Sequence, residues 1–223
     1  MQPLPARRLV ILTEGLWHVH NAKTAIGVIR YGTTPVVGLL DSTMAGRNVG
    51  EWLPGHDVPF VATVAEALAL PEPPTALLIG IAPTGGRLPA AWRSIILEAI
   101  GAGLDVLSGL HTMLGDDPEF AAAARAAGVA IVDFRRPPER EETAVGRPHR
   151  KGTRVMLTVA TDCAVGKMSV ALELRRGCPR TRRSRRLRAH RPDRDDDRGL
   201  GRRRRPRLRR LPSGHLRAAG RGG

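Results

Sequence analysis

Cysteine and aromatic residues are scarce in this chain of 223 residues, which contains 2 Cys, 3 Phe, 3 Trp and 1 Tyr. Two cysteines, Cys163 and Cys178, are too few for the disulfide framework of a small secreted domain. No apolar run approaches the ~20 residues that span a bilayer. The amino-terminal residues also lack the small-residue cleavage site of a secretory signal. These absences favour a cytoplasmic protein without a membrane segment.

The stretch from Arg175 to Gly223 lacks lysine, glutamate, aromatic residues and the β-branched apolar residues. It holds 20 of the 36 basic and 4 of the 21 acidic residues, so it supplies the whole net charge of +15, and the preceding 174 residues carry a net charge of −1. A segment with so little apolar surface to bury cannot offset the entropy of ordering. We therefore predict a disordered arginine-rich tail over residues 176–223, which binds nucleic acid only non-specifically.

The composition of this tail also suggests translation from a second reading frame. The composition changes abruptly near residue 175, within an apparent helix. A helix that follows a strand in this way packs on a sheet, and no further strand pattern follows it in the sequence. When residues 188–201 are written in codons with arginine as CGN, the frame starting at the second base permits the string V-P-T-G-Q-T-G-M-M-I-E-G-W-G. We therefore expect a frameshift that leaves the in-frame protein truncated after about residue 175.

Short apolar runs alternate with helical patterns through the first 134 residues. The expected strands cover residues 9–12, 35–40, 59–62, 76–81, 105–108 and 129–134, and the expected helices cover 22–30, 64–70, 90–102 and 118–127. Continuous apolar strands separated by helices indicate a parallel sheet that is covered on both faces. The predicted fold class is therefore α/β, with a doubly wound, Rossmann-like domain over residues 1–134.

Ligands of such sheets bind beyond the carboxyl ends of the strands, so the loops there supply the candidate site residues. The candidates are Glu14, Gly15, Lys23, Thr24, Asp41, Gly85 and Gly86. Asp41 ends the second strand, where a Rossmann domain often places a ribose-binding acid, but the first loop lacks G-x-G-x-x-G and gives little support to a nicotinamide site. A solvated helix face explains Lys23 and Thr24 equally well, and a tight turn explains the glycine pair. His111 is a candidate general base, although a lone histidine is more often structural.

Residues 135–152 are polar, charged and proline-containing, which is typical of a linker. A strand over residues 154–159, a loop and a helix over residues 170–175 follow in the order that a phosphate-binding loop requires. The residues expected around the anion are Thr161, Asp162, Cys163, Ala164, Val165, Gly166, Lys167, Met168 and Ser169. Met168 stands where a Mg²⁺-binding hydroxyl usually follows the lysine, so Ser169 is a candidate metal ligand displaced by one position. A plain strand–helix turn with an exposed lysine is the alternative.

Residues 160–167 resemble the Thr-Asp-x-x-Val-Gly-Lys loop of dethiobiotin synthetase-like P-loop proteins. The strings ILTEG, AKTAIGVIRYG, SGLH, GDDPEF and TDCAVGKMS are similar to a two-domain bacterial family that includes D-glutamate N-acetyltransferases. The resemblance covers roughly residues 8–175. It implies a Rossmann-like domain followed by a P-loop NTPase-like domain, of which residues 153–175 are the start. The string that the second frame permits also resembles the loop that follows the P-loop in this family.

The resemblance implies an acyltransferase that moves the acetyl group of acetyl-CoA to the amino group of a small acidic amino acid. It implies either acetyl-CoA or ATP with Mg²⁺ as the cofactor at the P-loop. Because most of the P-loop domain would be missing, the truncated chain is expected to be inactive. The alternatives are an ATP-dependent, dethiobiotin synthetase-like enzyme acting on a small carboxylate, and nucleic-acid binding through the basic tail. A small-molecule substrate is the expected partner, and a homo-oligomer stays open.

Overall fold

The computed structural model describes residues 7–18, 21–81, 88–137, 151–152, 155–161 and 165–177. Its sheet consists of β1 (Leu9–Leu12), β2 (Val36–Leu40), β3 (Phe60–Val61), β4 (Ala76–Ile79), β5 (Asp105–Ser108) and β6 (Ile131–Asp133). The strands are all parallel and lie in the order β3-β2-β1-β4-β5-β6. This is the strand order of a Rossmann fold, and it confirms the predicted α/β class.

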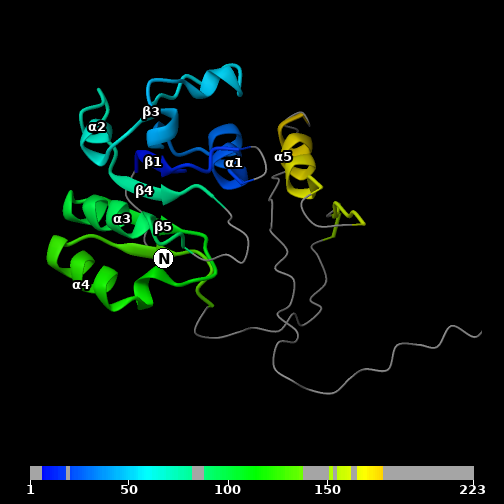
Figure 1. The fold of residues 1–223 in the computed structure, drawn as a ribbon. Helices are drawn as coiled ribbons and strands as arrows, with labels where there is room; N and C mark the ends of the chain where they lie inside the picture. Colours follow the sequence, from blue (N-terminus) through cyan, green and yellow to red (C-terminus); the bar gives the residue numbers. More distant parts are fainter. Residues whose placement is uncertain are drawn as a thin grey trace, which may run out of the picture. The chain divides into compact units, whose positions relative to one another are not determined.

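Helices cover both faces of this sheet (Figure 1), namely α1 (Lys23–Tyr31), α2 (Val64–Leu68), α3 (Trp92–Gly101) and α4 (Pro118–Ala127). Successive residues of a strand point to opposite faces. Accordingly, Val10 and Leu12 of β1 belong to a core cluster with α2, α3 and α4, whereas Leu9 and Ile11 belong to a second cluster with α1. Two cores on one sheet confirm the prediction of a doubly wound domain.

The ends of α4 show how closely local sequence determines a helix. The carboxylate of Asp117 accepts hydrogen bonds from the backbone N–H groups of Glu119 and Phe120, so it caps the first turn. Pro118 occupies a first-turn position, where its missing N–H costs nothing. Gly128 ends the helix with a φ of 69°, a left-handed conformation that favours glycine. The helix therefore begins and ends where the sequence predicts.

Most of the predicted elements are present, with small shifts at their ends. The bounds of β1, β5 and α4 agree residue for residue with the prediction, whereas β6 is shorter than the predicted 129–134. In the described part of the chain, three short 3₁₀ helices were not predicted from the sequence, η1 (Ser42–Met44), η2 (Val49–Glu51) and η4 (Leu114–Asp116). A three-residue helix has no apolar period to detect, so this omission follows from its length.

The strand predicted over residues 154–159 is wrong for the residues that the structure describes, because residues 155–160 have no regular secondary structure. A strand requires a hydrogen-bonded neighbour, and the described sheet ends with β3 on one edge and β6 on the other. The predicted helix is confirmed as α5 (Lys167–Gly177), which begins three residues earlier than expected. Apolar side chains of this segment, including Leu157 and Met168, are exposed.

Several predictions fall on residues outside the described ranges. Residues 138–150 of the predicted linker and the tail from residue 178 onward are among them. The predicted disorder is wrong for Arg176 and Gly177, because these two residues form the end of α5. The linker, the disorder of the rest of the tail and the domain boundaries stay predictions. Among the described helices, none combines the length and the apolar character that a membrane crossing needs.

Candidate functional site

The topology of the sheet places a candidate site beside the carboxyl ends of β1 and β4. These central strands pair with each other, and the helices that follow them, α1 and α3, pack in the two different cores. A crevice opens in Rossmann folds where the chain leaves neighbouring strands toward opposite faces, and ligands bind there. The loop after β1 is described up to residue 18, whereas residues 82–87 after β4 lie outside the described ranges.

Gly80 allows α1 to begin directly at this crevice. Its carbonyl oxygen accepts a hydrogen bond of 2.9 Å from the backbone N–H of Ala25 in the first turn of α1. A Cβ atom on Gly80 would lie 2.2 Å from Cγ2 of Ile11 and 3.1 Å from Cβ of Ala25. Only glycine permits this approach, and as a result Lys23 and Thr24 open α1 next to the ends of β1 and β4.

A buried polar pair joins the loops that follow β1 and β2. Thr13 and Asp41 are fully buried, and the Thr13 hydroxyl donates a hydrogen bond of 3.2 Å to the Asp41 carboxylate. The same carboxylate accepts bonds from the backbone N–H of Gly15 at 3.0 Å and from the N–H and hydroxyl of Thr43 at 3.2 and 2.6 Å. Both carboxylate oxygens of Asp41 are thus engaged within the protein.

Glu14 is an acid of the β1 loop that binds the β2 loop, just as Asp41 is an acid of the β2 loop that binds the β1 loop. Its carboxylate leaves the β1 loop and accepts hydrogen bonds from the backbone N–H of Ser42, at 2.7 Å, and from the Ser42 hydroxyl. The carbonyl oxygen of Glu14 accepts a bond of 3.2 Å from the indole N–H of Trp92, a buried residue of α3. The β1 loop is therefore held by the loop after β2 and by α3.

The loop that carries His111 is held along its length, while His111 itself is exposed. Buried Ser108 accepts a hydrogen bond from the backbone N–H of Leu110 through its hydroxyl oxygen. Arg135 donates to the carbonyl oxygen of Gly109 at 2.6 Å. This arrangement presents the imidazole to solvent at the carboxyl edge of the sheet.

Asp133 fixes the far end of the His111 loop. Its side chain is 3% exposed and accepts hydrogen bonds of 2.9 Å from the backbone N–H groups of Leu114 and Gly115. A Cβ atom on Gly115 would lie 3.1 Å from a carboxylate oxygen of Asp133, so a glycine suits this position. Arg136 donates to both Asp133 and Asp116, which balances the acidic charge here.

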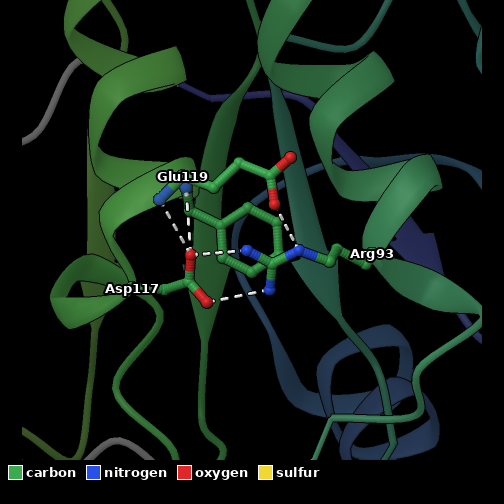
Figure 2. Close-up of polar contacts among 4 residues, drawn as sticks. Arg93, Asp117 and Glu119 are labelled. Carbon is green, nitrogen blue, oxygen red and sulfur yellow. Dashed lines mark hydrogen bonds and ion pairs between the residues drawn. The ribbon is translucent and has the colours of Figure 1, made fainter.

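The string from residue 115 to residue 120 continues into a polar network between α3 and α4 (Figure 2). Arg93 donates two hydrogen bonds to Asp117, at 2.6 and 2.8 Å, and one to Glu119. Its guanidinium carbon also lies 4.4 Å from the centre of the Phe120 ring. The bonded guanidinium lowers the pKa of Asp117 to about 2. These residues join two helices, which is a structural role.

The start of the predicted phosphate-binding loop is described in part. Gly166 has a φ of 94°, and α5 begins at Lys167, as a loop that ends in a helix amino terminus requires. Thr161 and Met168 are exposed, and Ser169 lies in the first turn of α5. The intervening Asp162, Cys163 and Ala164 lie outside the described residues. Within the described ranges, no group of three or more metal-ligating side chains gathers.

The structure brings together only part of the predicted site. Glu14, Gly15 and Asp41 share one network, and Lys23 and Thr24 begin the adjacent helix. His111 stands on a different loop, and Gly85 and Gly86 lie outside the described residues. The other members of that network were not predicted as site residues, although the first three lie in loops that were expected to bind a ligand: Thr13, Ser42, Thr43 and Trp92. Hydroxyl side chains in the loops after β1 and β2 were the signal in the sequence that could have indicated this network.

Comparisons with known proteins support this description. Residues 42–137 match the family model of a Rossmann-like domain of unknown function, DUF1611_N. A D-glutamate N-acetyltransferase of Tritonibacter scottomollicae is 36% identical over 153 residues, which are 69% of this chain and 42% of that protein. A D-glutamate N-acetyltransferase of a Pseudoalteromonas species is 40% identical over 97 residues, which are 44% of this chain and 29% of that protein. The chain thus spans less than half the length of either relative.

This chain is also similar in fold to a protein whose structure has been solved. The crystal structure of a DUF1611 family protein from Anabaena variabilis is 35% identical in sequence, with a TM-score of 0.67. The match covers 75% of this chain and 48% of that protein. The described sheet and its helices are therefore an α/β Rossmann-like fold of the kind found in the DUF1611 family.

Proposed function

We propose that this chain belongs to the DUF1611 family and carries the amino-terminal part of a D-glutamate N-acetyltransferase-like acyltransferase. The 36% identity over 153 residues to the Tritonibacter protein carries this proposal. The Rossmann strand order and the ligand crevice beside β1 and β4 support it, because they give the domain a place to bind a small molecule.

The proposed reaction transfers an acetyl group to an amine. A base removes a proton from the substrate ammonium group, and the free amine attacks the carbonyl carbon of the acetyl thioester. The new N–C bond forms while the C–S bond breaks, the nitrogen loses a second proton and the leaving sulfur gains one, so coenzyme A leaves as the thiol. His111, exposed at the carboxyl edge, is the proposed base, and Lys23 at the start of α1 is the proposed partner of a substrate carboxylate.

The segment from Thr161 to Ser169 is the proposed binding site for the phosphates of acetyl-CoA or of ATP. The left-handed Gly166 and the helix that begins at Lys167 fit an anion, because backbone N–H groups at a helix amino terminus point toward it. If Mg²⁺ accompanies ATP, Ser169 is the proposed ligand. An acyl donor would supply the activated acetyl group, whereas this segment would bind and orient its phosphates.

Isothermal titration with acetyl-CoA and, separately, with ATP and Mg²⁺ tests the ligand. We expect heat of binding with acetyl-CoA that is lost in Lys167→Ala and retained in Lys151→Ala, a matched control because Lys151 is an exposed lysine outside the loop. Binding of ATP and Mg²⁺ alone would favour the ATP-dependent alternative. No binding of either ligand would contradict a phosphate site in this chain.

A further inference from the structure

We propose that Glu14 and Asp41 form a reciprocal clamp that closes this Rossmann-like domain to NAD-type dinucleotides and fixes the β1 loop in one conformation. Each acid comes from one loop and binds a backbone N–H of the other, since Asp41 holds Gly15 and Glu14 holds Ser42. The proposal does not depend on the acyltransferase function.

Asp41 occupies a position that binds ribose in related folds. In dinucleotide-binding Rossmann domains an acid near the end of the second strand accepts hydrogen bonds from the ribose hydroxyls. Asp41 directly follows β2 and occupies that position, and β2 lies beside β1 as the fold requires. The same acid here is fully buried and accepts four hydrogen bonds from three residues of its own chain. A ribose could reach it only after those bonds break.

A dinucleotide-binding domain needs several glycines in the loop after β1, so that the pyrophosphate can approach the backbone. Gly15 has a φ of 68° and provides the tight turn. The residue two positions further is Trp17, whose ring lies 5.1 Å from the ring of Phe60 and 5.8 Å from that of Trp52, measured between centres. A packed indole therefore stands where the fingerprint would continue with glycine.

The contacts of Asp41 and those of Glu14 depend on each other. Asp41 cannot turn toward a ligand without releasing the N–H of Gly15, and Gly15 is the neighbour of Glu14. If the loop shifted at Gly15, Glu14 would lose its contacts with Ser42, and its carbonyl oxygen would lose the indole N–H of Trp92. The two acids therefore support each other, and opening one side of the clamp opens the other.

Amide hydrogen exchange on the full chain tests this coupling. In the wild type we expect slow exchange at Gly15 and Ser42. Glu14→Gln removes the charge but retains the shape of the side chain. It should speed exchange at least about tenfold at Ser42, whose N–H the Glu14 side chain binds, and also at Gly15, whose N–H is bound by Asp41 instead. Glu98→Gln, an exposed position on α3, is the matched control and should change neither amide.

Titration of the wild type with NAD⁺ and NADP⁺ tests the exclusion of dinucleotides, and we expect no saturable binding at millimolar ligand. Saturable binding of either dinucleotide would overturn the proposal. Unchanged exchange at Gly15 in the Glu14→Gln variant would also overturn it, because the two acids would then be independent contacts. Slow exchange in β5 provides the check that the variant is folded, and Ser42→Ala, which removes only the hydroxyl contact, is the second variant if Glu14→Gln does not fold.

Discussion

Arg93 and Asp117 join α3 to α4 through two parallel hydrogen bonds, and Asp117 simultaneously caps the first turn of α4. One carboxylate thus serves both a helix end and a contact between helices. Asp117→Ala should cost about 1 kcal/mol through the lost cap alone. Asp117→Asn should cost less, because asparagine also caps helices well. Urea unfolding of the two variants measures the difference, and equal losses would contradict a capping role.

The lowered pKa of Asp117 predicts a dependence of stability on pH. The Arg93 hydrogen bonds lower the pKa from its ordinary value of 3.8 to about 2 in the folded protein. The folded state therefore binds this proton less readily than the unfolded state, and the stabilising contribution is present above pH 3.8 and lost as the pH falls toward 2. Thermal unfolding between pH 5 and pH 2 should show a shallower fall for Asp117→Asn than for the wild type.

Gly80 and Gly27 form a matched pair for testing how closely α1 approaches the sheet. Gly80→Ala should destabilise the fold by about 1–3 kcal/mol, because the new methyl group would collide with Ile11. Gly27, inside α1, has open space where a Cβ would be built, so Gly27→Ala should stabilise the protein by up to about 1 kcal/mol. Denaturant midpoints with unchanged slopes check both signs, and a harmless Gly80→Ala would contradict the close contact.

The loop that carries His111 depends on Asp133. Asp133→Ala leaves the partly buried N–H groups of Leu114 and Gly115 without their acceptor, which should cost about 1–3 kcal/mol and speed amide exchange at both residues. Asp116→Ala removes an exposed partner of the same arginine and should have a much smaller effect. Similar losses in the two variants would contradict the special role of Asp133.

The arginine-rich stretch after residue 175 predicts a change of reading frame. Sequencing of the gene across codons 165–225 should show that a second frame stays open and encodes a glycine- and threonine-rich loop after the P-loop. If the arginine frame is the only open one, the tail is genuine. It must then be examined as a nucleic-acid-binding segment, through the salt dependence of binding with and without residues 176–223.

The sequence alone predicted a parallel sheet and the succession of strands and helices along the chain, because those depend on apolar periodicity and local caps. It did not predict the order of the strands within the sheet. β1 is a continuous apolar run, β5 is a short apolar run between Asp105 and Ser108, and Asp117, Pro118 and Gly128 mark the ends of α4. The prediction of a strand over residues 154–159 was wrong for the described residues, because a strand depends on more than its own apolar pattern. Its apolar pattern is that of a strand, but a pattern cannot supply the neighbour to which a strand must bond.

The site was harder to predict because its contacts join residues far apart in the chain. Glu14 and Asp41 were recognised as loop acids, but nothing in their sequence positions indicated that each holds the other's loop. The string from Gly115 to Phe120 marked a family resemblance, and the structure shows that it serves loop and helix packing around Asp133 and Arg93. A motif shared within a family can therefore belong to the scaffold.

The proposed function is that of the Rossmann-like part of a D-glutamate N-acetyltransferase-like enzyme. The most direct measurement follows release of free coenzyme A thiol from acetyl-CoA, with D-glutamate or L-glutamate as the acceptor. It compares this chain with a protein in which the second reading frame is restored after residue 175. We predict D-glutamate-dependent release by the restored protein and none by the present chain. Failure of a folded restored protein to use D-glutamate would contradict the proposed function, and turnover by the present chain would contradict the proposed frameshift.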